Sequence, residues 1–360
     1  MKVNFNKPYF PKVMRKQILK DIDLVLKNKK LMLGEKSKEL EEKFAKKIGS
    51  SLAISVNSAT TGLQIALRFA QVKNNEVIIP AASFITNVNS VLFESAKPII
   101  VDCNENTLTY DIKKLKKAIN RKTKAIVWIH LTGYISPEYK KIIDLAKENK
   151  ILLIEDASHA HGSIIDGKFA GTLGDVGIFS LYPTKVMTAG TGGVMTTNNL
   201  EIFNLAKSLR LFGRNINSDQ VDKLGNDWFL DEVRCCIALG QLNNLDKIIS
   251  KRIEAANYYY QNLPKDISYK MLRFSNSSIS SWYNFPIFFK SVKKAKLVRS
   301  LLLKKNIACK NIYKPIFEEE VFKKNNLGIN FPQAKKMLAS SLCLPMFTDI
   351  KKSELEYIVK

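Results

Sequence analysis

A single lysine lies between two apolar runs in the segment GDVGIFSLYPTKVMTAGTGGVMTTNN, residues 174–199. The first run ends near Ser180, and a glycine-rich turn separates Lys185 from the second run. An amine that is partly removed from water and lies near other cations has a lowered pKa, which makes it a usable nucleophile toward a carbonyl. The setting of Lys185 therefore predicts a covalent anchor for an aldehyde. A surface lysine is the alternative if no partner site accompanies it.

A carboxylate ends another apolar run in the segment LIEDASHAHG, residues 153–162. Burying an unpaired charge at the end of a strand is costly, so Asp156 needs a partner, and a protonated heterocyclic nitrogen would be one. A cap on the next turn is the alternative role for this aspartate. If Asp156 lies in one site with Lys185, the role as partner of a ring nitrogen is favoured; if it does not, the role as a cap is favoured.

Small hydroxyl residues stand where a strand turns into a helix in NSATTG, residues 57–62. Thr60 and Thr61, together with free backbone N–H groups, would form a cradle for an anion, and Ser180 could add a third hydroxyl. Ordinary helix N-caps are the alternative. An amine for an aldehyde, a carboxylate for a ring nitrogen and a cradle for a phosphate together predict pyridoxal 5′-phosphate as the cofactor.

The elements that must position these residues alternate along the first two thirds of the chain. Helical patterns at 60–70 and 137–149 lie among short apolar runs, which we expect to be strands at 52–56, 76–80, 98–102, 125–131, 151–156, 176–182 and 192–197. Such a pattern predicts an α/β fold with a mostly parallel sheet covered on both faces. Ligands of such sheets bind beyond the carboxyl ends of the strands, where the candidate residues lie.

The pattern changes after about residue 245, where a long helical stretch leads into a region with its own strands and helices. We therefore expect a large cofactor-binding domain over residues 1–245 and a smaller α+β domain over residues 246–360. Residues 1–15 are expected to pack on the smaller domain.

The composition is typical of a soluble protein except for a net charge of +24. The lysines are spread along the chain, which favours a compositional bias or attraction of an anionic substrate over nucleic-acid binding. The apolar runs are too short for a membrane span, and we expect a cytoplasmic protein. The five cysteines and three histidines lack metal-ligand spacing, so no metal site is predicted.

At this point the sequence resembles the DegT/DnrJ/EryC1/StrS family of fold-type I pyridoxal-phosphate aminotransferases, most of which act on keto sugars linked to nucleotides. The resemblance covers almost the whole chain. The segments that carry it, in this order and spacing, are LMLGEKSKELEEKFA, NSATTGLQIAL, PIIVDCNENTLTYD, LIEDASHAHGS, FSLYPTKVMTAGTGG and LASSLCLPMF.

The resemblance implies catalytic roles for three residues. Lys185 would form the internal aldimine and move the proton between the substrate carbon and the cofactor. Asp156 would pair with the pyridine nitrogen, and His159 would pack near the second ring face or the phenolic oxygen. Because the family keeps a lysine at this position for transamination, Lys185 favours amino transfer over dehydration.

The resemblance also implies how the cofactor is held. Phe84, in PAASFITN, would stack on one face of the ring. Thr60, Thr61 and Ser180 would bind the phosphate.

Two departures from the family pattern concern substrate recognition. The family usually has GxNxRxxE in a segment that reaches into the neighbouring subunit's site, and this chain has GNDWFLDE. Asp227 stands at the asparagine position and Phe229 at the arginine position. The resemblance implies that Asn226 and Asp227 contribute to cofactor binding near the phosphate, where either Asn226 takes the role, or the loop lies differently, or another cation offsets the carboxylate. Thr191 stands where many members have glutamate.

The leading hypothesis is a homodimeric aminotransferase with active sites shared between subunits. Glutamate or glutamine would donate the amine, and a keto sugar nucleotide would accept it in a ping-pong reaction. The alternatives are a dehydratase or isomerase of the same family, an aminotransferase for keto-cyclitols or small ketones, and a non-catalytic regulator on the same fold.

Overall fold

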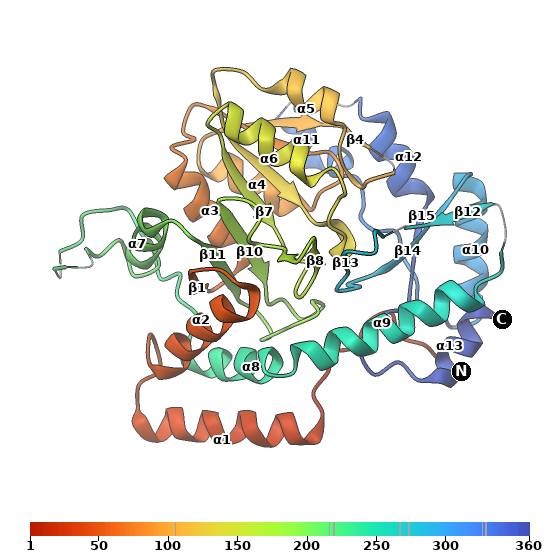
Figure 1. The fold of residues 1–360 in the computed structure, drawn as a ribbon, viewed down its shortest axis with the longest axis horizontal. Helices are drawn as coiled ribbons and strands as arrows, with labels where there is room; N and C mark the ends of the chain where they lie inside the picture. Colours follow the sequence, from red (N-terminus) through yellow and green to blue (C-terminus); the bar gives the residue numbers. More distant parts are fainter. Residues whose placement is uncertain are drawn as a thin grey trace.

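The computed structural model describes residues 1–360 except 105, 216, 219, 266, 267, 273, 326, 328 and 329. Its centre is a seven-stranded sheet (Figure 1). The spatial order of the strands is β1 (Leu52–Val56), β11 (Gly193–Thr197), β10 (Val176–Ser180), β7 (Leu152–Asp156), β6 (Thr123–Ile129), β2 (Glu76–Pro80) and β3 (Lys97–Val101). The sequence predicted all seven strands, with ends within two residues of those observed.

The sheet is mostly parallel, as predicted, because β10, β7, β6, β2 and β3 pair in parallel. Strand β11 runs antiparallel to both of its neighbours, β10 and β1. The connection between β10 and β11 contains no helix that would carry the chain across the sheet, and β11 returns beside β10 in the opposite direction. That connection carries Lys185 at the end of the sheet.

Both faces of the sheet are buried, which explains why its strands are continuous apolar runs. In β6, Ile126 and Trp128 belong to one apolar core, and Val127, which points the opposite way, belongs to the other. The first core includes residues of α2 (Glu35–Ile48), α5 (Ile112–Ala118), α6 (Tyr139–Glu148) and α8 (Glu232–Leu242). The second includes residues of α3 (Ala59–Phe69), α4 (Ile85–Phe93) and α7 (Leu200–Leu209).

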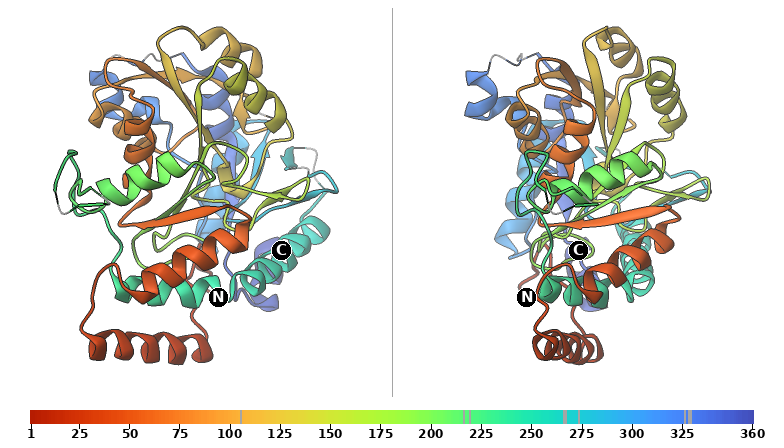
Figure 2. Two further views of the ribbon diagram at one scale, coloured as in Figure 1. Left: turned by 60° about the vertical axis from the view of Figure 1, so that its left-hand side comes forward. Right: turned by 90° about the vertical axis from the view of Figure 1, so that its left-hand side faces the viewer.

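Helix α1 (Lys12–Asn28) lies at the edge of the molecule alongside α8, as Figures 1 and 2 show. Its buried residues Met14 and Ile18 face Gly240 of α8, where a Cβ atom would lie 2.6 Å from the Ile18 side chain. The lack of a side chain at Gly240 thus allows the two helices to approach closely. The outer face of α1 retains exposed apolar residues, with Val13 81% and Leu19 66% exposed.

A third apolar core surrounds a three-stranded antiparallel sheet that follows the long helix α9 (Leu245–Asn262). This sheet consists of β12 (Tyr269–Met271), β14 (Phe285–Phe289) and β15 (Ser341–Leu344). Its neighbours in the chain are α10 (Val292–Lys304), α11 (Glu320–Lys324), α12 (Pro332–Ser340) and α13 (Lys352–Val359). The proposed boundary at residues 245 and 246 coincides with the start of α9.

The N-terminal segment lies against this C-terminal region. Val3 pairs with Ile307, the Phe5 carbonyl accepts a hydrogen bond from the Met346 N–H, and the Lys7 amine lies 3.8 Å from the Glu354 carboxylate. Residues 1–15 are predicted to pack on the smaller domain. Residues 3–7 do lie against the C-terminal region, but residues 12–15 belong to α1, which packs along α8, so the prediction is wrong for them.

Short strands also join the two predicted domains. The hairpin of β8 (Ile164–Ile165) and β9 (Lys168–Phe169) pairs with β13 (Ser278–Ile279). A separate two-stranded ribbon of β4 (Cys103–Asn104) and β5 (Thr109–Tyr110) lies within the larger predicted domain. Within the described residues, no helix combines the length and apolar character needed to cross a membrane. The same residues contain no cluster of three or more His, Cys, Asp or Glu side chains suited to a metal ion.

Candidate active site

A cavity of about 520 Å³ lies beyond the carboxyl ends of β1, β7 and β10. Its lining brings together six residues predicted from sequence, namely Thr60, Phe84, Asp156, His159, Ser180 and Lys185. Thr191 also lines it, whereas Thr61, Asn226 and Asp227 do not. The order of the strands in the sheet explains this convergence, because β7 and β10 are neighbours and β11 leads back to β1.

Lys185 is held on a compact turn between β10 and β11. Its backbone N–H donates to the Tyr182 carbonyl at 3.0 Å, and the Ala189 N–H donates to the Leu181 carbonyl at 3.0 Å. Its amine lies 5.0 Å from the centre of the Tyr283 ring. Burial lowers the pKa of Lys185 from 10.5 to about 8; the positive charge of Lys310 acts in the same direction, and Asp156 opposes it. A neutral, nucleophilic amine is therefore accessible near physiological pH.

The pKa of Lys185 gives a pH dependence with a definite sign. Below pH 8 the amine is increasingly protonated, so cofactor-free protein should capture pyridoxal phosphate roughly tenfold more slowly for each pH unit lost. The growth rate of the visible absorption band, measured from pH 6 to pH 10, checks this expectation. Lys310→Gln should move the midpoint to higher pH, because Lys310 lowers the pKa of Lys185. A midpoint near 10.5 in the unsubstituted protein would contradict the assignment.

Asp156 is 8% exposed and ends strand β7. Its Oδ2 accepts a hydrogen bond from Asn87 Nδ2 at 3.1 Å, and its Oδ1 accepts one from the Ser158 N–H at 3.1 Å. A carboxylate has about four acceptor positions, so these two bonds orient the group and leave it able to accept a proton donor from the cavity. Asp156 is thus a buried anion with two fixed neutral partners, suited to pair with a protonated ring nitrogen.

The contacts of His159 specify its proton. Its Nδ1 lies 3.2 Å from the Thr132 N–H and must accept from it, and Thr132 holds a φ of 63° that is uncommon for a β-branched residue. Burial, followed by the charge of Lys185, lowers the pKa of His159 well below 6.5, so the ring is neutral. Its proton therefore lies on Nε2 and is donated to the Tyr313 oxygen at 2.8 Å. The Tyr313 proton is left for an acceptor in the cavity.

The start of α3 forms one end of the cavity. The Ser58 side chain accepts from the Thr61 N–H, and the N–H groups of Ala59 and Thr60 have no preceding helical carbonyl to bond. Gly193 brings β11 against this turn, because a Cβ atom there would lie 2.7 Å from the Ala59 nitrogen. With the hydroxyls of Thr60 and Ser180 on the same wall, this end is suited to a phosphate dianion.

Thr61 makes an internal contact instead of lining the cavity. Its hydroxyl donates to Asn57 Oδ1 at 2.6 Å, while Asn57 Nδ2 donates to the Asp227 carbonyl at 3.2 Å. Asn57 thereby links the first turn of α3 to the 225–232 segment. Asn226 and Asp227 are exposed at this place, so their contribution to cofactor binding stays a prediction that concerns a neighbouring subunit.

Three lining residues beyond position 280 were not identified from sequence: Tyr283, Lys310 and Tyr313. The Tyr283 ring stacks on His159 with centroids 3.9 Å apart, and its hydroxyl lies 3.1 Å from that of Thr184. Phe84, which is 51% exposed, lies 5.6 Å from the Tyr313 ring. The aromatic walls of the cavity thus come from both predicted domains, and no local sequence pattern marks the second set.

The cavity fits pyridoxal phosphate by the chemistry of its donors and acceptors. It combines a buried amine of lowered pKa, a buried carboxylate with spare acceptor positions, and free N–H groups at a helix start. In addition, Asn87 Oδ1 on the wall is buried without a hydrogen-bond partner among the described residues, as expected where a ligand completes the site.

Comparisons with known proteins identify the family of the chain. A family model described as the DegT/DnrJ/EryC1/StrS aminotransferase family matches residues 12–360. The chain is 31% identical over 350 residues to UDP-4-amino-4,6-dideoxy-N-acetyl-beta-L-altrosamine transaminase of Campylobacter jejuni, covering 94% of this chain and 92% of that protein. It is 26% identical over 327 residues to GDP-perosamine synthase of Escherichia coli O157:H7, covering 90% and 88% respectively.

A solved structure extends the likeness to three dimensions. Helicobacter pylori PseC, described as an aminotransferase involved in the biosynthesis of pseudoaminic acid, has a TM-score of 0.91 and 26% identity, covering 100% of this chain and 97% of that one. The chain therefore belongs to the DegT/DnrJ/EryC1/StrS family and is a sugar aminotransferase that uses pyridoxal phosphate.

Proposed function

We propose that this enzyme transfers an amino group from glutamate or glutamine to a keto sugar linked to a nucleotide, in a ping-pong reaction. The observation that carries the proposal is the buried Lys185 amine, which shares one cavity with Asp156 and His159 in a chain of this family. The names of two relatives support an acceptor sugar that is linked to a nucleotide. One relative is named for a GDP-linked sugar and the other for a UDP-linked sugar. Because donor and acceptor would both have to reach Lys185 in this cavity, they would occupy it one after the other, as a ping-pong reaction requires.

Bound pyridoxal phosphate supplies an electron sink for the carbon that carries the amine. Lys185 Nζ would remove the proton from that carbon and return it on the acceptor, a task suited to a pKa of about 8. Asp156 would hold a proton on the ring nitrogen that faces it. Tyr313, which accepts from His159, would donate its own proton to an oxygen in the cavity.

The test follows the cofactor and then the product. The purified holoenzyme should show a visible absorption band that disappears when glutamate or glutamine is added. Subsequent addition of UDP- or GDP-linked 4-keto sugars should restore the band and yield an amino sugar nucleotide by mass spectrometry. A band that ignores both donors, or full activity on unlinked keto-cyclitols alone, would overturn the proposal.

We further propose a homodimer with shared active sites. The exposed apolar face of α1 is suited to contact with a second copy, and the exposed Asn226 and Asp227 lie outside the cavity of their own chain. A cytoplasmic location accords with the five cysteines, which are all buried and form no disulfide with one another.

Dilution tests the shared site. Activity per subunit should fall as the protein is diluted to monomers, because each site would lose the partner's loop. Analytical ultracentrifugation and activity should be measured over the same concentration range, and reconcentration should restore turnover. A monomer with undiminished activity would exclude the shared arrangement.

A further inference from the structure

A second groove, of about 630 Å³, lies beside the catalytic cavity. It is formed by α10, the segment 310–315 and α12. The groove and the catalytic cavity share two lining residues, Lys310 and Tyr313, and are therefore adjacent. A ligand with its reacting end near Lys185 would have to pass these side chains to place an extended remainder in the groove.

The groove is strongly basic. Five cationic side chains line it, namely Lys296, Arg299, Lys310, Lys314 and Lys335, against a single carboxylate, Glu318. Lys314 is paired with Glu319, its amine lying 3.1 Å from that carboxylate. The four remaining cations outnumber Glu318, which is the one carboxylate in the described lining. A groove that is lined mainly by positive charge attracts a polyanion.

Arg299 lines this groove and is oriented by a neighbouring side-chain amide. Its Nη1 donates to Asn311 Oδ1 at 3.2 Å. The Asn311 amide is itself fixed, because Nδ2 donates to the carbonyls of Leu338, Ala339 and Ser341 at 2.9, 3.3 and 2.8 Å. One donor of the guanidinium is thus used to orient it, and the remaining donors are available for the bidentate contacts that suit phosphate.

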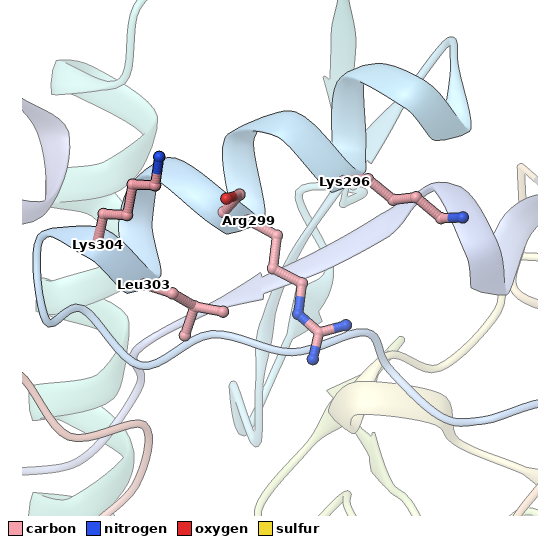
Figure 3. Close-up of a pocket in the computed structure, with 5 residues that line it drawn as sticks. Lys296, Arg299, Leu303 and Lys304 are labelled. Carbon is pink, nitrogen blue, oxygen red and sulfur yellow. The ribbon is translucent and has the colours of Figure 1, made fainter.

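The groove is lined by only some of the cations of α10. Figure 3 shows Lys296 and Arg299 together with Leu303 and Lys304, which line a neighbouring hollow of about 450 Å³ on this helix, and Lys304 does not line the groove. Lys293, which is exposed on the same helix, does not line the groove. α10 therefore carries both the cations that face the groove and a matched cation that does not.

We propose that this groove binds the diphosphate of the nucleotide-linked acceptor, with the keto sugar directed past Tyr313 to Lys185. The inference rests on the proposed function, because it names the part of that substrate which the groove recognises. It also assigns a source of positive charge within the chain, where the 225–232 segment has Phe229 at the position of the family's arginine. Arg299 and Lys296 are the residues that determine this recognition.

The experiment measures binding of UDP, GDP and inorganic pyrophosphate to the holoenzyme by titration calorimetry. Lys296→Gln combined with Arg299→Gln should weaken nucleoside diphosphate binding about tenfold or more, since hydrogen bonds to charged groups are lost. Arg299→Lys should weaken nucleoside diphosphate binding by an intermediate factor. The lysine keeps the positive charge but cannot make the bidentate contact of a guanidinium group. Lys293→Gln should bind as the unsubstituted protein does. The visible band of bound cofactor provides the folding control for every variant.

The outcomes separate the groove from the overall function. Equal affinity of the double variant and the unsubstituted protein, or no nucleoside diphosphate binding at all, would overturn the groove assignment. If nucleotide-linked keto sugars are aminated with the same KM by both proteins, the groove proposal fails and the function stands. If UDP or GDP binding depends on Arg299 but no such sugar is aminated, the groove stands and the proposed reaction fails.

Discussion

Lys185→Ala should remove the absorption band of the lysine-bound cofactor and lower turnover by roughly 10⁴-fold or more. The substitution deletes the covalent anchor and also the group that would move the proton, and acid–base catalysis alone typically contributes 10²–10⁴-fold. The start of α3 and Asp156 remain, so pyridoxal phosphate should still bind without a covalent link. Absorption spectra and turnover of the reconstituted variant test both parts of this expectation.

Two controls separate a chemical role of Lys185 from a structural one. Lys168→Ala, at an exposed lysine on β9, should leave spectrum and turnover unchanged. Added ethylamine should restore part of the turnover of Lys185→Ala, because a small free amine can enter the space vacated by the side chain. A lysine-type band that persists in Lys185→Ala would show that another amine holds the cofactor.

Asp156→Asn should retain bound cofactor but lower turnover by roughly 10²–10³-fold, the usual effect of removing one preorganised electrostatic partner. The asparagine has nearly the same shape and can still accept from Asn87 or Ser158 through its one oxygen. It is neutral, however, and no longer stabilises a proton on the ring nitrogen. Turnover and the cofactor content of the dialysed variant measure the two effects separately.

Asp144→Asn is the matched control. Asp144 is exposed on α6, and its substitution removes the same negative charge from the surface. Its turnover should equal that of the unsubstituted protein. Near-normal turnover of Asp156→Asn would exclude the electronic role and leave only a structural one for this carboxylate.

The strands of the large sheet could be predicted closely because the burial of each strand is visible in its own residues. A strand covered on both faces is apolar at most positions, so runs such as EVIIP at 76–80 are visible without any knowledge of their neighbours. The pairing of β11 with β1 and that of β8 with β13 depend on partners far along the chain. Two-residue strands such as β13 have no periodicity to detect.

The candidate site could be predicted in part for the same reason. Asp156 and Ser180 end apolar runs, and Lys185 follows one, so their common edge of the sheet follows from the topology. Tyr283 and Tyr313 reach the cavity only through tertiary packing, and nothing in their local sequence distinguishes them from core tyrosines. Thr61 was predicted to bind the phosphate because of its place at the start of the helix. Its hydroxyl instead donates a hydrogen bond to Asn57, one turn earlier in the chain, and this contact could not be read from the sequence.

The wall that encloses Lys185 has a consequence for how the enzyme matures during synthesis. The bond from His159 to Tyr313 joins residues 154 positions apart, and Tyr283 also follows the lysine by a long stretch of chain. Because a nascent chain emerges from its N-terminus, the catalytic amine stays open to water and to cellular aldehydes until the last part of the chain has been made. Capture of the cofactor in its finished pocket therefore has to follow the synthesis and folding of the residues up to Tyr313.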